Sequence, residues 1–329
     1  MKIAFLMDHL ETIDPEFETT SYLMYECNQR GHTVFFLEPH DLYVREQKVV
    51  ARMENIEVPR DLPIEEYWQR AIKCIKKEDR NFEVITEIDA LFLRKDPPLN
   101  YEVIELLAPI SDKLTVINDP GSLILGNSKL YTLNFTELIP ETHISRDPKR
   151  LRKIIDTFGG DMIIKPLGRF GGEGVIKVSS RDPENLNSLI NFYVKAFKPY
   201  PERDAIMVQE YLKEVKEKGD VRILMLNGEI LGAMSRKSPE EGFRTNIHAG
   251  GLAFKHTITE KEKEICDIVG RRLVKDGLQF VGLDIIGERL IEINCVSPGG
   301  IPRINQLDNK KLEVPVIDFV EKKVSENRS

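Results

Sequence analysis

Residues 280–298, FVGLDIIGERLIEINCVSP, read as two apolar strands joined by a short turn, and three polar side chains interrupt them. The three are Asp284, Glu292 and Asn294. Residues two apart in a strand point to the same face of a sheet, so Glu292 and Asn294 share a face. A fold that contains this hairpin must therefore satisfy oxygen-bearing side chains inside an otherwise apolar strand pair.

The turn of this hairpin decides how close the polar side chains come. We expect a three-residue turn at residues 287–289, which include a glycine. Ile286 then pairs with Leu290, and Asp284 falls opposite Glu292. Directly opposed Cβ atoms lie about 4.5–5.5 Å apart, and two carboxylates that close raise each other's pKa unless a cation separates them. Oxygen ligands suit Mg²⁺, so the hairpin predicts a magnesium site. The alternative is a solvent-facing polar strip on an edge strand.

Composition and charge exclude several classes of protein. The 329 residues indicate two or three domains. Lys and Arg number 47 against 54 for Asp and Glu, and this net charge of −7 argues against non-specific binding of nucleic acid. The four cysteines form no C-x-x-C pair, so no zinc site or disulfide framework is indicated. We see no signal peptide and no apolar run of the roughly 18 residues that a membrane span needs, and we expect a cytoplasmic protein without membrane or nucleic-acid partners.

The first third of the chain predicts a parallel α/β domain. An apolar run at residues 2–7 is followed by a helix at 20–30 and a second apolar run at 32–38, an order typical of a strand–helix–strand unit. The remaining elements expected up to residue 125 are hairpin strands at 42–58, a helix at 64–77, a strand at 88–94, a helix at 101–107 and a strand at 114–118.

The rest of the chain has a different character. Two strands flank a glycine-rich loop, and Asn227-Gly228 marks the turn of a second hairpin. The elements expected are strands at 161–167, 174–180 and 205–212, the hairpin at 221–237, and helices at 183–196, 260–275 and 313–324.

The glycine-rich loop KPLGRFGGEGVIKV carries the second chemical signal. Backbone N–H groups at glycines approach and wrap anions, of which phosphate is the usual one. The loop runs from strand to strand and lacks the G-K-[ST] ending, so it differs from a P-loop and from a dinucleotide fingerprint. We predict a flap that covers a nucleotide, and the alternative is a flexible turn without a ligand. The glycines concerned are Gly168, Gly171, Gly172 and Gly174.

Two lysines and one strand end support a nucleotide site. Lys165 lies in an apolar strand, where an ammonium group is costly unless it is paired, and a phosphate would satisfy it. Lys129 offers a second ammonium group, although alone it reads as a surface helix residue. The segment VQEYL offers polar side chains and backbone groups that could hydrogen-bond to the edge of the nucleotide base. The alternative is that this segment is only the end of a strand. Its candidate residues are Gln209, Glu210, Tyr211 and Leu212.

Together these motifs resemble the ATP-grasp superfamily, and more closely the bacterial glutathione synthetases. The resemblance covers nearly the whole chain, and the segments that carry it, besides those quoted above, are MDHL, LFLRKDPP, NSKLYTLNFTELIPET, GDVRILMLNGEILGAMSRK and FRTNIHAGG. It implies an ATP-grasp fold of three parts, with ATP held between the second and the third. The three parts are an N-terminal parallel-sheet α/β domain at 1–125, a central lid subdomain at 126–204 and a C-terminal α+β subdomain at 205–329.

The resemblance also implies a reaction, the ATP-dependent ligation of a carboxylate to an amine through an acyl phosphate. Asp284, Glu292 and Asn294 would hold two Mg²⁺ ions that bridge the ATP phosphates, with Mn²⁺ as an alternative ion. Arg222 and Arg236 would stabilise the transferred phosphate and the oxyanion. Surface salt bridges are the alternative for both arginines.

For glutathione-forming members the donor is γ-glutamylcysteine and the acceptor is glycine. Thr20 lies near the donor contacts of that family, although the alternative for Thr19, Thr20 and Ser21 is an ordinary helix N-cap. The other candidate substrate residues are Arg244, Asn246, Ser297, Gly299 and Gly300. The family's usual S-P-T-C is replaced here by S-P-G-G, and its N-L-A-A-G-G by N-I-H-A-G-G.

These departures leave three functions open. The first is glutathione synthesis, and the second is ligation of another donor or acceptor by the same mechanism. The third is a catalytically silent nucleotide-binding protein. We expect the backbone N–H groups of Gly299 and Gly300 to be free for the acceptor's carboxylate. The family further implies a homo-oligomer.

Overall fold

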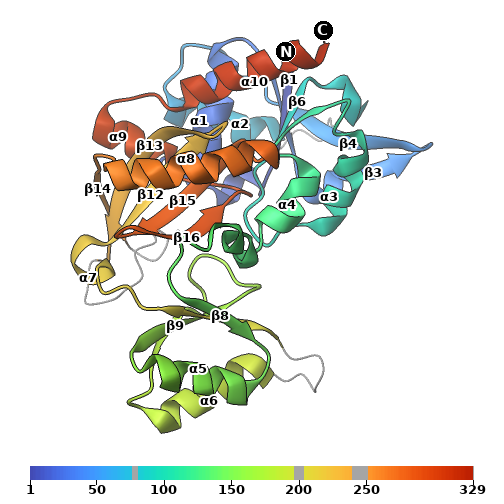
Figure 1. The fold of residues 1–329 in the computed structure, drawn as a ribbon. Coiled ribbons are helices and arrows are strands. Elements are labelled where there is room, and N and C mark those ends of the chain that lie inside the picture. Colours follow the sequence, from blue (N-terminus) through green and yellow to red (C-terminus); the bar gives the residue numbers. More distant parts are fainter. Residues whose placement is uncertain (76–80, 196–203, 239–250, 329) are drawn as a thin grey trace.

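The computed structural model describes residues 1–75, 81–195, 204–238 and 251–328. In these residues the chain forms three β-sheets with helices packed against them. Figure 1 shows the four-stranded sheet and its helices as a central lobe that stands apart from the rest of the molecule. The predicted α/β class is confirmed.

The N-terminal sheet consists of four parallel strands extended by antiparallel ones. Its strands are β1 (Lys2–Leu6), β2 (Thr33–Leu37), β3 (Leu42–Arg45), β4 (Lys48–Asn55), β5 (Asn81–Val84), β6 (Ala90–Leu93) and β7 (Thr115–Ile117), in the order β3-β4-β2-β1-β6-β7 with β5 paired to β4. Its α-helices are α1 (Thr19–Gln29), α2 (Ile64–Ile75), α3 (Tyr101–Leu107) and α4 (Pro120–Gly126). Short apolar runs such as ALFL suit strands that are buried on both faces, and the predicted strand–helix–strand unit is confirmed as β1, α1 and β2.

The central lobe is an antiparallel sheet with the order β10-β9-β11-β8. Its elements are β8 (Thr142–Ser145), α5 (Pro148–Phe158), β9 (Asp161–Pro166), β10 (Ile176–Ser179), α6 (Pro183–Lys195) and β11 (Ile206–Glu210). Apolar side chains of α5, α6 and the sheet, such as Ile155, Ile164 and Ile190, form a core of their own. The lobe therefore packs as a separate body. The predicted division at residues 125 and 204 stays a prediction, and β11 belongs to the sheet of this lobe.

The C-terminal sheet has the order β14-β13-β12-β15-β16 and is antiparallel throughout. Its elements are α7 (Val215–Lys218), β12 (Asp220–Leu226), β13 (Glu229–Lys237), β14 (Leu252–Lys255), α8 (Glu260–Lys275), β15 (Phe280–Ile286), β16 (Arg289–Asn294), α9 (Ile301–Asp308) and α10 (Glu313–Arg328). The short 3₁₀ helices of the chain are η1 (Leu10–Thr12), η2 (Pro39–Asp41), η3 (Ile85–Glu87), η4 (Ala108–Ile110) and η5 (Lys129–Phe135).

The N-terminal and C-terminal sheets share their hydrophobic core. One cluster of buried side chains contains Leu91 of β6 together with Val269 of α8 and Val281 of β15. Helix α10 returns to the N-terminal part of the chain, where Arg30 donates from Nη1 to Asp318 at 2.7 Å. These two sheets consequently form one body, and the central lobe is attached to it (Figure 1).

The two predicted hairpins form, with one correction. Asn227 and Gly228 take the positive φ angles of 49° and 82° that a two-residue turn between β12 and β13 requires. Asp284 lies opposite Glu292 as predicted, but the three-residue turn is wrong: Ile286 pairs with Arg289 across a two-residue turn, and an irregularity after Asp284 restores the register. Sequence spacing did not reveal this bulge because a two-residue turn with one extra residue in β16 gives the same pair of opposed carboxylates as a three-residue turn.

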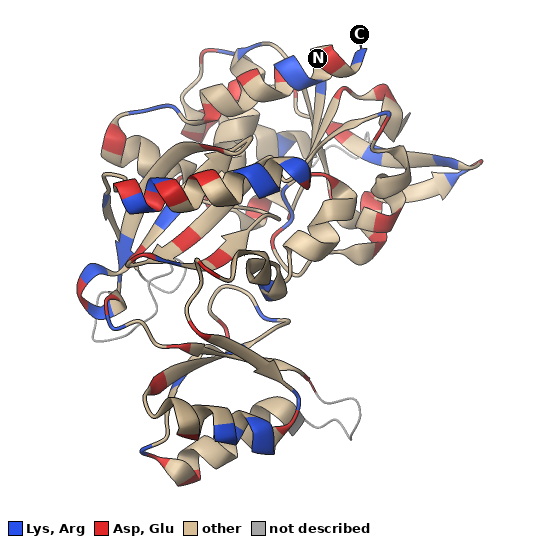
Figure 2. Ribbon diagram, in the orientation of Figure 1, with Lys and Arg blue, Asp and Glu red and all other residues tan. Residues whose placement is uncertain are grey.

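Figure 2 shows charged residues of both signs on α8 and α10, with acidic residues in the first turn of α8 and basic residues in its last turn. Among the described residues, no helix has the length and apolarity that crossing a membrane requires.

Candidate active site

Polar side chains converge on one face of the C-terminal sheet. Asp220 and Arg222 lie two apart on β12, so they share a face. The strand register places Arg236 of β13 beside Asp220, and Asp284 of β15 beside Arg222. Glu292 of β16 lies next to Asp284. Both predicted arginines are therefore on this face, and they are not surface salt bridges, because both are buried.

Asp284 lies between the two arginines. Arg222 donates from Nε to Oδ1 at 2.5 Å and from Nη2 to Oδ2 at 2.9 Å, and Arg236 approaches Oδ1 to 3.0 Å. Asn294 donates from Nδ2 to Oδ2 at 3.2 Å. Burial opposes ionisation of Asp284, but the two guanidinium groups outweigh it and hold the pKa of the carboxyl well below its usual range.

Asp220 completes this charge cluster, and sequence reasoning missed it. Arg236 donates from Nε and Nη2 to the two carboxylate oxygens of Asp220, at 2.9 and 2.5 Å. Burial raises the pKa of Asp220 despite the neighbouring arginine. The signal was available: Asp220 and Arg222 alternate with apolar residues in GDVRILML, which is the pattern of a strand with one polar face.

The donor chemistry of the three predicted metal ligands suits a hard divalent cation. The side chain of Glu292 makes no hydrogen bond or ion pair within the residues that the structure describes, and the side chain of Asn294 uses only its amide N–H₂, so an oxygen of each is available. A carboxylate offers about four acceptor positions, and all four of Asp284 already face donors. Glu292 and Asn294 therefore fit a cation in their present conformation. Asp284 would first have to lose one of the N–H groups that its carboxylate accepts from. The metal role of all three stays a prediction.

The nucleotide side of the site is built on β9 and β11. Lys165 of β9 is half-buried and donates from Nζ to Oε1 of Gln209 at 2.7 Å. Burial lowers the pKa of Lys165 to about 8, although the carboxylate of Glu292 raises it in part. Burial also lowers the pKa of Lys129, and Glu292 again opposes the shift. Two desolvated ammonium groups thus lie within the electrostatic reach of one free carboxylate.

The glycine-rich loop contacts one of these groups, Lys129. Figure 1 shows the segment after β9 rising from the central lobe toward the other sheets. The ammonium group of Lys129 donates to the carbonyl oxygen of Arg169 and lies 5.3 Å from the ring centroid of Phe170. A cavity of about 50 Å³ lies between Phe170, Glu292 and Asn294. The role of this loop as a flap over a nucleotide stays a prediction.

The four glycines of the loop differ in their surroundings. Gly171 and Gly172 have φ angles of 61° and 78°, which disfavour other residues, yet a Cβ at either position would meet only open space. A Cβ on Gly168 would likewise meet only open space. A Cβ on Gly174 would come within 2.9 Å of Pro166. Three of the four are thus open to a ligand, and Gly174 is required by packing.

The predicted base-binding segment, residues 209–212, begins beside Lys165, since Gln209 accepts a hydrogen bond from that lysine. Gln209 is buried and links Lys165 to Oγ1 of Thr142, to which it donates at 2.8 Å. Lys177 lies 4.5 Å from the ring centroid of Tyr211. The N–H of Glu210 donates to the carbonyl oxygen of Glu141, so it is not free for a base edge. The nucleotide role of these residues and of Leu212 stays a prediction.

Two of the predicted substrate residues, Thr20 and Ser297, both hydrogen-bond to Arg94. Thr20 lies in the first turn of α1, whose N-cap is Glu18 rather than a threonine, and its Oγ1 accepts from Nε of Arg94 at 2.9 Å. Arg94 also donates from both Nη atoms to the carbonyl oxygen of Pro298 at 3.2 Å. Ser297 donates from Oγ to the carbonyl oxygen of Arg94 at 3.2 Å. Sequence reasoning missed Arg94, whose signal was a charged residue directly after the apolar run ALFL.

One expectation about the S-P-G-G segment is wrong. The N–H of Gly300 donates to Oγ1 of Thr19 at 3.1 Å, so it is not free for a ligand. Gly300 has a φ of 139°, which explains the glycine at this position. Gly299 accepts from Nη1 of Arg222 at 3.2 Å through its carbonyl oxygen, and a Cβ there would meet open space. Arg244 and Asn246 lie outside the described residues.

Comparison with known proteins decides the family. The model of the prokaryotic glutathione synthetase N-terminal domain matches residues 1–123, and that of the prokaryotic glutathione synthetase ATP-grasp domain matches residues 128–309. The chain belongs to the prokaryotic glutathione synthetase family. The predicted resemblance and the predicted ATP-grasp fold are confirmed, and the protein is an ATP-dependent ligase by family.

Curated glutathione synthetases match this chain along almost their whole length. The glutathione synthetase of Gloeobacter violaceus is 38% identical over 330 residues, which cover 97% of this chain and 96% of that protein. The glutathione synthetase of a Nostoc species is 37% identical and covers 98% of both chains. Members of this family use ATP and a divalent metal.

Solved structures share the fold at low identity. The crystal structure of the D-cycloserine synthetase DcsG superposes with a TM-score of 0.65 at 11% identity and covers 99% of both chains. A RimK domain ATP-grasp protein from Sphaerobacter thermophilus has a TM-score of 0.62 at 13% identity, with 97% of this chain and 99% of that chain covered. These likenesses support the ATP-grasp fold only.

Proposed function

We propose that this protein is a glutathione synthase, which joins the cysteinyl carboxylate of γ-glutamylcysteine to the amine of glycine and converts ATP to ADP and phosphate. The observation that carries the proposal is the position of Lys165 and Lys129. Lys165 lies on β9 directly before the glycine-rich loop, Lys129 donates to the carbonyl oxygen of Arg169 in that loop, and the carboxylate of Glu292 raises the pKa of each. Family membership and the names of the curated relatives support the choice of substrates.

In this proposal the ATP phosphates lie between the glycine-rich loop and the C-terminal sheet. Lys165 and Lys129 neutralise phosphate charge, and the open backbone at Gly171 and Gly172 approaches the phosphate oxygens. The segment at residues 209–212 faces the nucleotide base. Closure of the loop excludes water, which would otherwise hydrolyse the acyl phosphate.

Glu292 and Asn294, with Asp284, hold the divalent cations, for which we propose two Mg²⁺ ions. When bound, such ions offset the charge of the ATP phosphates and withdraw electrons from phosphorus. The free carboxylate of Glu292 supports this assignment, because a half-buried carboxylate without a partner is costly.

The chemistry proceeds in two steps without a covalent bond to the protein. A carboxylate oxygen of the donor attacks the γ-phosphorus of ATP, the bond to the bridging oxygen of ADP breaks, and an acyl phosphate forms. The amine of glycine then attacks the carbonyl carbon, the C–O bond breaks, phosphate leaves, and the nitrogen loses its proton to the phosphate or to solvent. Positioning and charge neutralisation are what such a reaction requires of the protein.

Arg222 and Arg236 are proposed to stabilise the oxyanions of these steps. Nη1 of Arg236 has no acceptor among the described residues, and the Nη1 of Arg222 donates to the carbonyl oxygen of Gly299. Asp284 and Asp220 hold both guanidinium groups in fixed orientations. Fixed donors stabilise developing charge without the reorganisation that water would need.

The donor is proposed to lie near Thr20, and the acceptor near Ser297 and Gly299. The open space at Gly299 favours one second candidate, a ligase of the same mechanism with an acceptor larger than glycine. The catalytically silent alternative has less support, since the lysine, arginine and carboxylate groups of the site are all present. Arg244 and Asn246 remain proposed substrate residues.

A homo-oligomer is proposed from the apolar side chains exposed on α4 and η5. Leu125 is 71% exposed, and Ile124, Leu130 and Leu133 are exposed beside it in sequence. We place the reaction in the cytoplasm, since none of the four cysteines, all of them in the described residues, forms a disulfide.

Phosphate release tests the function. We expect release from ATP and Mg²⁺ only when γ-glutamylcysteine and glycine are both present, with glutathione formed in equal amount by mass spectrometry. Release with another donor or acceptor pair, but not with this one, would establish the second candidate. No release with any pair, in protein that still binds ATP, would leave the silent nucleotide-binding protein.

A further inference from the structure

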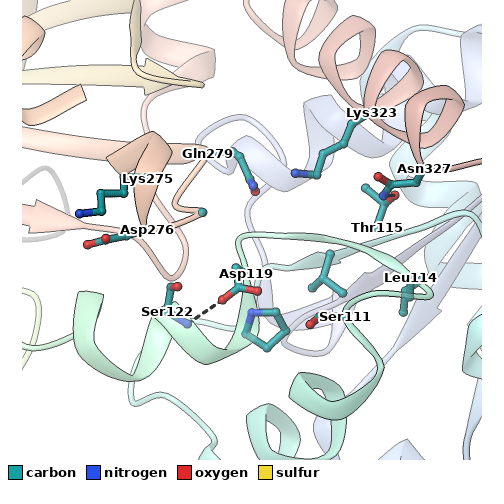
Figure 3. A pocket seen from close by; sticks show the side chains of 13 residues that line it. Ser111, Leu114, Thr115, Asp119, Ser122, Lys275, Asp276, Gln279, Lys323 and Asn327 are labelled. Carbon is teal, nitrogen blue, oxygen red and sulfur yellow. Dashed lines mark hydrogen bonds between the residues drawn. The ribbon is translucent and has the colours of Figure 1, made fainter. Parts of the chain in front are cut away.

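A cavity of about 440 Å³ lies outside the candidate active site, and its volume is typical of small-molecule sites. It is bordered by the end of α8, the start of α4 and the last turns of α10 (Figure 3). It shares no lining residue with the cavity under the glycine-rich loop. The polar side chains that line it are Ser111, Thr115, Asp119, Ser122, Lys275, Asp276, Gln279, Lys323 and Asn327.

Gln279 is the unexplained group of this cavity. The residue is 7% exposed, and its Oε1 has no hydrogen-bond partner among the described residues. Buried amide oxygens are nearly always satisfied, because an unpaired one costs about 1–3 kcal/mol. Figure 3 shows the amide of Gln279 pointing into the cavity. A ligand that donates a hydrogen bond would satisfy this oxygen.

Opposite charges flank Gln279. Lys323 of α10 is half-buried, makes no ion pair within the described part of the chain, and extends its ammonium group toward the same space in Figure 3. The carboxylate of Asp119 uses Oδ1 to accept from the N–H of Ser122 at 2.8 Å. Burial lowers the pKa of Lys323, and Asp119 opposes that shift, so the two charges interact across the cavity.

We propose that this cavity binds a small zwitterion, an amino acid or a short peptide. Its ammonium group lies between the carboxylate of Asp119 and Oε1 of Gln279, and its carboxylate lies against the ammonium group of Lys323. A simple anion would face Asp119, and a simple cation would face Lys323. Only a ligand with both charges complements both ends and also donates to the amide oxygen.

The site is linked to the element that begins at Lys129. Asp276, which lines the cavity, accepts from the hydroxyl of Tyr131 at 2.8 Å, and Tyr131 belongs to η5. The proposal does not depend on which reaction the protein catalyses.

Calorimetry with three matched ligands tests the charge requirement. Glycylglycine carries both charges, N-acetylglycylglycine lacks the ammonium group, and glycylglycinamide lacks the carboxylate. We expect glycylglycine to bind the full chain, and each blocked form to bind about tenfold more weakly or less, since charge-assisted hydrogen bonds are lost. Equal binding of the acetylated form would overturn the proposal in favour of an anion site. Absence of glycylglycine binding at millimolar concentration would also overturn it.

Variants locate the site. Lys323→Met and Gln279→Leu should each weaken glycylglycine binding about tenfold. Lys322→Met, on the exposed face of the same helix, should leave it unchanged. Lys165→Ala should also leave it unchanged, so loss of nucleotide binding and loss of this site are separable. If Lys323→Met and Gln279→Leu both leave glycylglycine binding unchanged, whatever the effect of Lys165→Ala, the peptide binds elsewhere and the proposal fails.

Discussion

Arg222 and Asp284 form a buried ion pair with two hydrogen bonds, from Nε to Oδ1 at 2.5 Å and from Nη2 to Oδ2 at 2.9 Å. The pair joins β12 to β15, and Arg236 binds the same carboxylate from β13. A residue predicted to stabilise phosphate and a residue predicted to hold metal are therefore each other's partners. Their arrangement fixes the direction of the guanidinium group, which is what the proposed reaction needs.

Arg222→Lys should lower kcat/KM about ten- to a hundredfold while the protein stays folded. Lysine keeps the charge but cannot donate two parallel hydrogen bonds to Asp284, and charge-assisted bonds contribute about 1.5–3 kcal/mol each. Steady-state kinetics on the purified variant measure the effect, with circular dichroism as the check on folding. Arg289→Lys on the exposed part of β16 is the matched control and should retain activity. Normal kcat/KM in the folded Arg222→Lys variant would contradict the role of this pair.

ATP affinity should fall as pH rises through about 8. Burial lowers the pKa of Lys165 to about 8, so the ammonium form that attracts phosphate predominates below this pH and the neutral amine above it. Lys165→Ala should weaken ATP binding about ten- to a hundredfold and should remove this part of the pH dependence. Calorimetric titrations of a non-hydrolysable ATP analogue across this pH range measure both effects.

Lys153→Ala, an exposed lysine on α5 of the same lobe, is the control for Lys165 and should behave as the unaltered protein. An identical pH profile in Lys165→Ala and the unaltered chain would remove Lys165 from the nucleotide site.

Glu292→Gln should lower kcat about a hundredfold or more, because a metal that bridges phosphates contributes several kcal/mol to the transition state. The change is nearly isosteric, and Glu292 has no partner among the described residues, so thermal stability should change little. Activity is measured against Mg²⁺ concentration, and Glu288→Gln in the exposed turn of the same hairpin is the control. Unaltered activity at low Mg²⁺ would show that this face of the hairpin is a solvated polar strip.

Gly299→Thr should sharpen selection of glycine over alanine as acceptor. A side chain at this position enters open space beside the proposed acceptor site, whereas Gly300 is held by its φ of 139° and its bond to Thr19. One methyl group contributes about 1–3 kcal/mol of discrimination in a pocket that a clash defines. The ratio of kcat/KM for glycine to that for alanine is measured in both proteins. If the ratio does not move, the acceptor binds elsewhere.

The sequence was most informative where short periodicities apply. A period of two placed Glu292 and Asn294 on one face, where both lie beside Asp284, and Asn227-Gly228 marked the turn between β12 and β13 because few residues accept two successive positive φ angles. The helix at α3 was predicted with its observed limits, and in the structure the side chain of Asn100 caps its N-terminus. By contrast, β8 is a four-residue edge strand without buried side chains, and no pattern predicted it.

The site required contacts that no local pattern contains. Arg94 reaches Pro298 across 204 positions of the sequence, and Thr19 reaches Gly300 across 281. From sequence alone, the S-P-G-G segment was therefore predicted to bind an anion through free N–H groups, although the N–H of Gly300 donates to Thr19. The paired arginines at Asp284 were likewise invisible, because they depend on which strands are neighbours.

The central claim is that ligation proceeds through an acyl phosphate of the donor carboxylate. The decisive measurement uses γ-glutamylcysteine whose cysteinyl carboxylate is labelled with heavy oxygen, together with glycine, ATP and Mg²⁺. Mass spectrometry of the released phosphate should find one labelled oxygen in each phosphate, since the attacking carboxylate oxygen leaves with phosphorus, and glutathione should form in equal amount. Unlabelled phosphate released without glutathione would contradict the claim, because it would mean that water, rather than the donor, attacks ATP.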